Sequence, residues 1–418
     1  MGHDRRATGV PRAGVHSPYD AVMRPLRDPQ FRRAVLIVLA VVGWTGVAWI
    51  GILLASMSPP RAGDDLQLLL DAAGRLVAGE PLYVTVPAEG SLQAENLFYS
   101  YPPPVAQALV PLVGVPLEVV LVSWGLGAVA GLALVGTRLA GPGPDRALAI
   151  VALAPYVAPF AVALLFGNVN AWFPFLFGLV LLAVLAGGRG PVAAGGIALA
   201  VATAAKIHPA SLGLWLLVRG ARRHDAREPS VALAAVAVGL AILAVSLLAW
   251  GIDPWLAWVD FLRSGAATTD LVNRLNVGPA SQLALLLGLD GAAARSIQVV
   301  VTVAALVGTV VAAGLVRDPV ASFAWAVVAS LVVLPVTWVH YPVALIPVAI
   351  AALARVPAER RAIVVGLMGG VIAVGMIAVA VPVTIWIAVG LVLASAHVAV
   401  GSQLGRQASQ VPKVGTGR

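Results

Sequence analysis

The feature that most constrains this chain is a series of apolar stretches of about 20 residues, which recur almost from one end to the other. A helix needs about 20 apolar residues to cross the hydrocarbon core of a bilayer. Hydrophobic residues fill 60% of the 418 positions and charged residues only 11%, whereas soluble domains carry about a quarter charged residues. The sequence therefore predicts an all-α polytopic membrane protein without a separate soluble domain.

Matching these stretches to the bilayer thickness predicts twelve spans, with both termini on one side. The run at 102–115 begins with three prolines and is too short for an ordinary crossing, so we assign it to a juxtamembrane or re-entrant helix. The predicted spans lie near 34–57, 118–137, 147–166, 169–186, 191–205, 209–218, 231–250, 296–316, 319–337, 341–354, 362–381 and 383–401.

The basic residues set the orientation, because cytoplasmic loops of membrane proteins are enriched in Lys and Arg. With twelve spans, 21 of the 27 Lys and Arg residues lie on the side of the termini and 6 on the other. Both termini are therefore predicted to be cytoplasmic. This bias explains the net charge of +8, so no nucleic-acid partner is predicted. The abundance of Ala, Gly, Val and Arg, with only two Lys, suggests a bacterial source and thus a bacterial plasma membrane.

Segments outside the spans are few. Residues 1–33 are polar and Arg-rich and are predicted to form a disordered cytoplasmic tail, followed by one transmembrane domain at 34–401 and a second tail at 402–418. The two long extracytoplasmic loops are 58–117 and 251–295. The chain has no cysteine, which excludes thiol catalysis and iron–sulfur clusters. Its histidines show no metal-ligand spacing, so no metal cofactor is expected.

Two adjacent carboxylates begin an amphipathic segment in the first long loop. The segment 64–79 reads as a helix that starts at an Asp and stops at Gly79. Asp64 is expected either to cap this helix or to take part in chemistry. Asp65 is then free for another role. A carboxylate at the membrane surface beside apolar walls is expected to have a raised pKa and can act as a general base.

Three short outer turns carry further polar residues on the same side. Asn168 and Asn170 lie between two spans and suit either turn formation or a binding role. Lys206 lies at a helix break where positive charge is scarce, next to His208, and is a candidate phosphate partner or a side chain that snorkels to the interface. His340 lies at a span end, where a His is often an interfacial hydrogen-bonding residue.

The second long loop and the turn at 338 combine aromatic and polar side chains. This composition suits sugar binding by stacking and hydrogen bonding, and it equally suits a helix lying in the interface. The candidate acceptor contacts are Trp255, Trp258, Asn273, Arg274, Asn276 and Trp338.

The order and spacing of several short pieces carry a family resemblance. These pieces are 63–65, 71–73, 78–83, 101–103, 167–170, 204–209, 219–223, 276–288 and 338–341. Their arrangement resembles the GT-C superfamily of multispanning glycosyltransferases. More narrowly, it is similar to glycosyltransferase family 87, also called DUF2029, which includes polyprenol-phosphate-mannose-dependent α-1,2-mannosyltransferases of phosphatidylinositol mannoside synthesis. At two positions the chain departs from the family pattern, with Asn168 where Gln is frequent and Leu69 where Tyr is found.

The resemblance implies a GT-C fold and an inverting transfer of a sugar, mannose by analogy, from a polyprenyl-phosphate donor to a glycolipid or lipid-linked glycan acceptor. It implies that the catalytic carboxylate is Asp65, with Asp64 as the alternative. His340 matches the family's Trp-x-His motif. Together with this residue, the implied donor contacts are Lys206, His208, Tyr341, Asn168, Asn170 and Tyr101.

Two other classes of membrane protein fit parts of the pattern. Twelve spans with cytoplasmic termini also suit a secondary transporter or a lipid flippase. Transporters, however, usually place coupling charges near the bilayer midplane, and no Asp or Glu lies inside an apolar run here. A scaffolding subunit would need neither an acidic outer loop nor Asp65. The sequence therefore favours an enzyme.

Overall fold

The computed structural model describes residues 18–58, 61–83, 98–156, 159–263, 271–377 and 385–397, and helices account for most of them. The α-helices up to the first polar turn are α1 Pro18–Arg27, α2 Pro29–Ser56, α3 Asp64–Ala78, α4 Pro103–Leu109, α5 Leu117–Ala140, α6 Pro144–Tyr156 and α7 Pro159–Leu165. Those that follow are α8 Phe173–Ala186, α9 Arg189–Ala205, α10 Ala210–Arg223, α11 Arg227–Trp250, α12 Asp253–Arg263, α13 Pro279–Leu287, α14 Gly291–Leu315, α15 Pro319–Val332, α16 Ile346–Arg355, α17 Ala358–Ile377 and Ile385–His397. Short 3-10 helices are η2 Val110–Leu112, η3 Val169–Trp172 and η5 Tyr341–Leu345.

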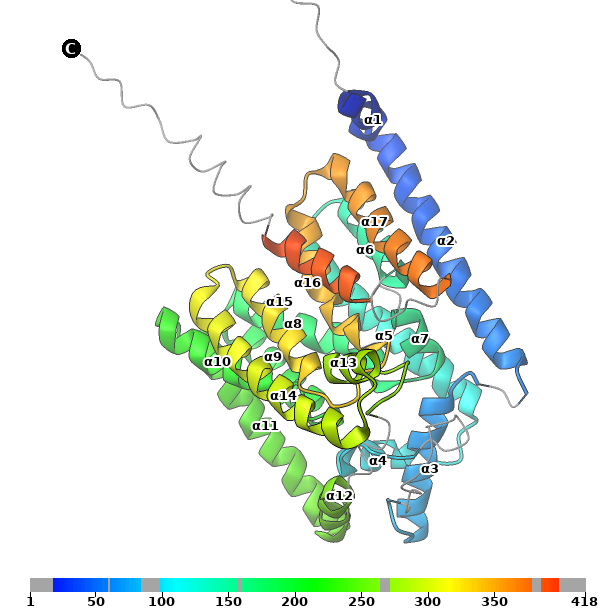
Figure 1. Cartoon of the computed structure of the whole chain (residues 1–418), viewed down its shortest axis with the longest axis vertical. Coiled ribbons are helices and arrows are strands. Elements are labelled where there is room, and N and C mark those ends of the chain that lie inside the picture. The colour runs from blue at the N-terminus through cyan, green and yellow to red at the C-terminus, as the bar shows by residue number, and fades with distance from the viewer. Residues whose placement is uncertain are drawn as a thin grey trace, which may run out of the picture.

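The helices form an elongated bundle with two different ends (Figure 1). The upper end in this view carries α1 and the start of α2, whereas α3, α4 and α12 lie at the lower end. Helix α9 packs between α8 and α11, and α14 packs against α10 and α15. The short helices α3 and α4 therefore form a cap on one end of a bundle of longer helices.

Several helices are long and apolar enough to cross a membrane. Five pass this test singly, namely α2, α5, the segment Val169–Ala186, α11 and α14, and the pair α6 and α7, bent by 71°, makes a sixth span if it is counted as one. Leu248 of α11 stays 88% exposed, as expected of a side chain that faces lipid. The structure confirms an all-helical protein with multiple membrane spans. The count of twelve and the orientation stay predictions, because other apolar helices, such as α9 and α15, are shorter.

Two hydrophobic clusters organise the interior. The larger one joins α8, α10, α15 and α16, with the aromatic rings of Phe173, Phe177, Trp215 and Phe323 fully buried at its centre. The smaller one lies between α3, α4 and the start of α5, around Leu66 and Leu69. Helix α3 is therefore anchored by its apolar face, as its amphipathic sequence predicts.

The predicted N-terminal tail is too long. Helix α1 begins at Pro18 and α2 begins at Pro29, where the Asp28 side chain caps the helix by accepting a bond of 2.9 Å from the Gln30 backbone N–H. Asp at the cap followed by Pro at the first helical position is a strong start signal. Residues 1–17 and the predicted tail at 402–418 lie outside the described residues.

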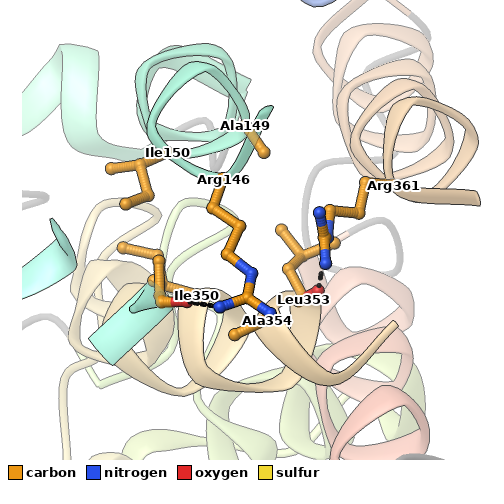
Figure 2. Close-up of a pocket in the computed structure, with 8 residues that line it drawn as sticks. Arg146, Ala149, Ile150, Ile350, Leu353, Ala354 and Arg361 are labelled. Carbon is orange, nitrogen blue, oxygen red and sulfur yellow. Dashed lines mark hydrogen bonds between the residues drawn. The ribbon is translucent and has the colours of Figure 1, made fainter. Parts of the chain in front are cut away.

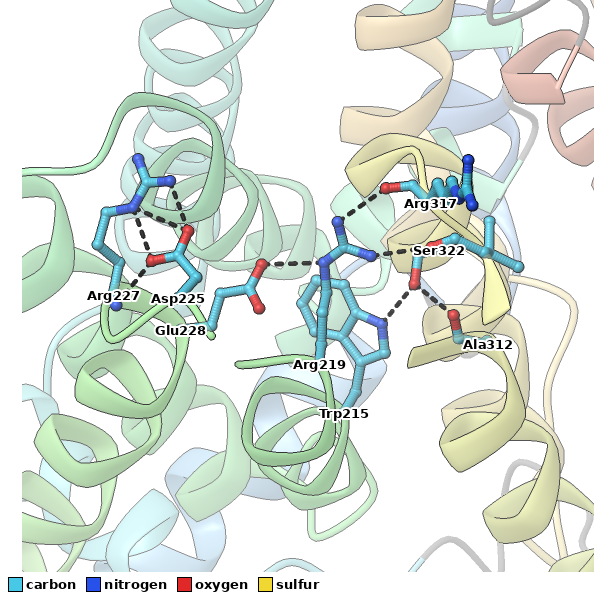
Figure 3. A network of polar contacts seen from close by, with 9 residues as sticks. Trp215, Arg219, Asp225, Arg227, Glu228, Ala312, Arg317 and Ser322 are labelled. Carbon is cyan, nitrogen blue, oxygen red and sulfur yellow. Dashed lines mark hydrogen bonds and ion pairs between the residues drawn. The ribbon is translucent and has the colours of Figure 1, made fainter. Parts of the chain in front are cut away.

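A buried ion pair ties α10 and α11 to the connection between α14 and α15 (Figure 3). The Arg219 guanidinium of α10 donates 2.9 Å to Glu228 of α11 and 3.0 Å to each of the Val316 and Arg317 carbonyls beyond α14. A buried charge needs this many partners to offset its desolvation. Arg219 belongs to one of the motifs that carry the family resemblance, and the structure gives it an architectural role.

Candidate active site

The start of α3 is docked on the turn that follows α7. The first N–H groups of a helix lack partners within the helix, and here the backbone N–H groups of Gly63 and Leu66 donate to the carbonyls of Leu165 and Phe166, at 2.8 and 3.1 Å. Gly167 has φ of 65° in this turn, and a Cβ placed there would lie 2.5 Å from the Leu66 Cβ. Glycine is required for this close approach, which aims the first turn of α3 at the residues after Gly167.

The close approach brings Asp65 to Asn168. The Asn168 side-chain amide donates 2.8 Å to the Asp65 carboxylate and makes a longer contact of 3.4 Å with the Tyr101 hydroxyl. The Asn168 side-chain oxygen in turn accepts 2.9 Å from the Asn170 backbone N–H. Asn168 is therefore both the cap of η3 and the orienting partner of Asp65, so its turn-forming role is confirmed and a binding role stays a prediction.

Lys206 lies in the same region, beside the rings of Tyr101 and Tyr341. Helix α9 ends at Ala205, and Lys206 is extended, with φ of −150°. Its ammonium lies 3.7 Å from the centre of the Tyr341 ring and 5.4 Å from that of Tyr101. The residue is only 8% exposed, and its Nζ has no hydrogen-bond partner among the described residues. Cation–π contacts therefore take the place of hydrogen bonds at this ammonium, and an unpaired buried cation of this kind is unusual.

Two buried histidines flank this lysine. His340 packs edge-on against Tyr341 at 5.0 Å between ring centres, and His208 lies 3.4 Å from the Ser330 hydroxyl through Nδ1. In the described part of the chain, the Nε2 atoms of both rings are buried without a hydrogen-bond partner. Because buried polar atoms are almost always paired, these atoms and Lys206 Nζ together indicate a site that a polar ligand completes.

The electrostatics of the site couple Asp65 to Lys206. Burial raises the pKa of the Asp65 carboxyl above its ordinary value, while the hydrogen bond from Asn168 and the charge of Lys206 act to lower it. Burial lowers the pKa of Lys206 to about 7, against the opposing effect of Asp65. Burial and the nearby Lys206 charge both lower the pKa of His208 and of His340, so both imidazoles are neutral at physiological pH.

Seven of the residues singled out from the sequence therefore meet in one place, although they come from five separate segments. These residues are Asp65, Tyr101, Asn168, Lys206, His208, His340 and Tyr341. Asp65 and Tyr101 are partly exposed, whereas the lysine and both histidines are buried. Asn170 is fully buried nearby, and neither polar atom of its side chain has a partner among the described residues.

Asp64 behaves differently from its neighbour. It is the first residue of α3 rather than its cap, because the cap position is Gly63, at φ of 85° and without a side-chain hydrogen bond. The expectation that Asp64 caps the helix is therefore wrong. The positive charge that acts on Asp64 is that of Arg61, whereas Asp65 is the carboxylate that contacts Asn168. Gly79, in the left-handed conformation at φ of 70°, ends the helix as predicted.

The candidate acceptor contacts do not form one cluster with these residues. Trp255 and Trp258 pack edge-on within α12, and Trp255 donates 2.8 Å to the Ser246 hydroxyl. Arg274 is exposed, and Asn273 accepts 2.8 Å from the Leu275 backbone N–H. Trp338 lies opposite Asn276 in an isolated antiparallel bridge. None of these contacts is made with Asp65 or Lys206.

Asn276 has a structural role. Its amide donates to the Leu271 and Pro335 carbonyls at 2.9 and 3.0 Å, and its oxygen accepts 2.9 Å from each of the Gly278 and Thr337 backbone N–H groups. All four hydrogen-bonding positions of the side chain are therefore used. Asn276 ties the loop before α13 to the turn that carries His340, and it is not available to an acceptor.

Several residues that position the site were not singled out from the sequence. Tyr83 donates 2.8 Å to the Tyr101 carbonyl, Tyr99 donates 2.8 Å to the Pro102 carbonyl, and Trp124 donates 3.4 Å to the Asn168 carbonyl. Ser330, the partner of His208, is one of two serines in the apolar helix α15, and nothing in the sequence separates it from Ser322. Across the described ranges, no group of three or more His, Asp or Glu residues is placed to hold a metal ion.

Comparison with known proteins places this geometry in a family. No curated protein matches the chain. The sequence model of glycosyltransferase family 87 matches residues 99–337, which is more than half of the chain and includes every segment of the site except the start of α3 and the residues from His340 onward. With its apolar helices, the chain therefore belongs to glycosyltransferase family 87 and is a membrane glycosyltransferase.

Proposed function

We propose that the chain transfers mannose from a polyprenyl-phosphate donor to a glycolipid or lipid-linked glycan acceptor, with formation of an α-1,2 linkage on the extracytoplasmic face of a bacterial plasma membrane. The observation that carries this proposal is the pairing of a partly exposed carboxylate, Asp65, with a buried and unpaired ammonium, Lys206, in one site. The acceptor hydroxyl needs a carboxylate to take its proton, and the anionic leaving group needs a cation to stabilise its charge.

Asp65 is the proposed general base. In an inverting transfer the acceptor oxygen forms a bond to the anomeric carbon while the bond from that carbon to the phosphate oxygen breaks. The acceptor proton passes to the Asp65 carboxylate, and the electron pair of the broken bond leaves with the polyprenyl phosphate. Formation of an α-linkage by inversion requires a β-linked donor. The Asn168 amide holds one carboxylate oxygen, and the other is the proposed acceptor of the proton.

Lys206 is the proposed phosphate contact. The leaving phosphate gains negative charge in the transition state, and a fixed cation in a dry site stabilises such charge by about 2.7–4 kcal/mol. Lys206 is held by the rings of Tyr101 and Tyr341 without any competing carboxylate bond. It therefore enters the reaction already desolvated. The phosphate charge is assigned to this residue, and the proposal includes no metal ion.

The neutral histidines are proposed to contact the sugar and the phosphate. The Ser330 hydroxyl donates 2.7 Å to the Val327 carbonyl, so its oxygen is left to accept from His208 Nδ1. The Nε2 atom of His208 is then an acceptor, which suits a sugar hydroxyl. His340, beside Tyr341, and Asn170 complete the proposed donor contacts. The Trp255 and Trp258 rings on α12 are proposed to line the acceptor side.

The experiment that tests the donor uses membranes from cells that express the protein. These are incubated with radiolabelled polyprenyl-phosphate mannose and, in parallel, with the glucose and arabinose donors, and the lipid products are identified by mass spectrometry. Transfer of mannose supports the proposal. Transfer of a different sugar only would replace mannose and leave the site assignment standing. Activity with a nucleotide sugar but with none of these lipid donors would refute it.

A further inference from the structure

A second cluster of cations lies at the end of the bundle opposite α3 (Figure 1). Arg32 and Arg33, in the first turns of α2, both bind the Asp145 carboxylate at the start of α6, with distances of 3.0 Å. Arg146 and Arg361 stand beside this trio and line a small cavity between α6, α16 and α17 (Figure 2). The cluster is separate from the site of Asp65 and Lys206.

The two cavity arginines lack a carboxylate partner. Arg146 donates 3.0 Å to the Ala140 carbonyl, and Arg361, which is buried, donates 3.2 Å to the Leu353 carbonyl. Neither forms a salt bridge among the described residues, because Asp145 is taken by Arg32 and Arg33. The charges that act on Arg361 are Arg146 and Arg32, which repel it, and Asp145 and Glu359, which attract it. Four arginines thus face two carboxylates.

The chemistry of the two guanidinium groups indicates the ligand. The cavity beside them exposes only apolar surface, with Ile150, Ile350 and Leu353 among its lining residues. Both guanidinium groups are donors, and none of their nitrogen atoms is among the buried unpaired ones. They therefore suit an acceptor outside the cavity, and an anionic oxygen accepts better than water.

The location of the cluster indicates where this oxygen comes from. Helix α2 is a candidate membrane span that begins at Pro29, so Arg32 and Arg33 mark the level at which the chain leaves the hydrocarbon layer. Phospholipid phosphates lie at this level, and basic pockets between membrane helices bind anionic head groups. We propose that Arg146 and Arg361 bind a phosphate group of an anionic phospholipid at this level of the membrane.

The test measures lipid binding to the purified full-length protein in detergent. Its unfolding temperature is followed as phosphatidylglycerol, phosphatidylcholine or inorganic phosphate is added, and bound lipid is counted by native mass spectrometry. We expect phosphatidylglycerol to raise the unfolding temperature more than phosphatidylcholine. A saturable effect of inorganic phosphate that phosphatidylglycerol does not exceed would keep the phosphate site and assign it to free phosphate. The absence of a specific effect from all three would overturn the proposal.

The variants separate the site from general surface charge. Arg146→Gln and Arg361→Gln are each expected to weaken phosphatidylglycerol binding about tenfold or more. Arg360→Gln removes the same charge from the neighbouring exposed residue and should bind as wild type does. Arg361→Lys keeps the charge and serves as the second variant if Arg361→Gln does not fold. Equal affinity in all four variants, or equal weakening by Arg360→Gln, would refute the site.

Discussion

Asp65 and Lys206 act on one another's charge within a single site, although 141 positions separate them in the chain. The carboxylate is fixed by Asn168 at 2.8 Å, and the ammonium is fixed by the Tyr341 ring at 3.7 Å. Neither residue uses the other as its structural partner. Two opposite charges that lie in one site without forming an ion pair can each serve a different part of one reaction. Transfer from a phosphate donor to a hydroxyl requires both a base and a stabilising cation.

Replacing Lys206 by Met tests the phosphate contact. Met has a similar length and no charge, so we expect kcat/KM for the lipid donor to fall about 10²–10³-fold, the loss found when one charge-stabilising group is removed. The unfolding temperature should not fall, because the substitution removes a buried charge without a hydrogen-bond partner. A fall in unfolding temperature with unchanged kcat/KM would instead make Lys206 a structural residue.

The pH dependence of kcat/KM should show a basic limb that belongs to Lys206. Its pKa is lowered to about 7, so the free enzyme loses the positive charge, and with it donor binding, as pH rises through about 7. Arg stays charged at all accessible pH values. Lys206→Arg should therefore abolish this limb, even if its overall activity is lower. A basic limb that persists unchanged in Lys206→Arg would belong to another group.

Asn168→Ala should shift the acidic limb. The amide of Asn168 donates to the Asp65 carboxylate and lowers its pKa, in opposition to burial. Without this bond the pKa of Asp65 rises, so the base becomes protonated at higher pH and the acidic limb of kcat/KM moves upward. Gln67→Ala removes an exposed contact with Asp71 on the same helix and is the control, which should leave the limb in place. Coincident limbs in wild type and Asn168→Ala would contradict the assignment.

Gly167→Ala tests whether the docking of α3 positions the carboxylate. The new methyl group would lie 2.5 Å from the Leu66 Cβ at a positive φ, so we expect a destabilisation of about 1–3 kcal/mol and a loss of transfer activity. Gly74→Ala, within α3 itself, places a methyl group that meets no atom within 4 Å, so this variant should be neutral or stabilising. Thermal unfolding of both variants, with activity measured on the folded fraction, distinguishes them. Wild-type activity in Gly167→Ala would show that the approach of α3 is not needed.

Most residues of this cluster could be predicted, because they are polar residues at unusual positions in the sequence. Lys206, His208 and His340 are polar groups at the ends of apolar runs, where an unpaired polar side chain is costly. Asn276 is also a polar residue beside apolar runs, but its side chain forms hydrogen bonds with four backbone groups. Two of these groups lie about 60 positions further along the chain. Only the folded structure separates these two outcomes. The same limit applies to Ser330, because its role as a hydrogen-bond partner depends on where His208 lies in the fold.

The helix boundaries were harder to predict for a different reason. Mean hydropathy reflects composition. It does not show where a helix breaks, or where a polar capping residue starts a new helix. Asp28 and Pro29 begin α2 within the segment that composition assigned to a disordered tail. The predicted span at 147–166 is divided into α6 and α7, which meet at 71°. Both departures follow from Pro and capping residues, which act locally and have little effect on mean hydropathy.

The most direct measurement of the central claim compares Asp65→Asn with Asp64→Asn in the same membranes. Radiolabelled mannose transfer from polyprenyl-phosphate mannose to endogenous lipid is followed at matched expression. Asn keeps the shape of the side chain and cannot take the acceptor proton, so Asp65→Asn should lower the turnover about 10²–10⁴-fold. Asp64→Asn alters a carboxylate that forms no hydrogen bond with Asn168 in the described part of the chain, so it should retain most activity. Wild-type turnover in Asp65→Asn, or loss of activity only in Asp64→Asn, would contradict the account.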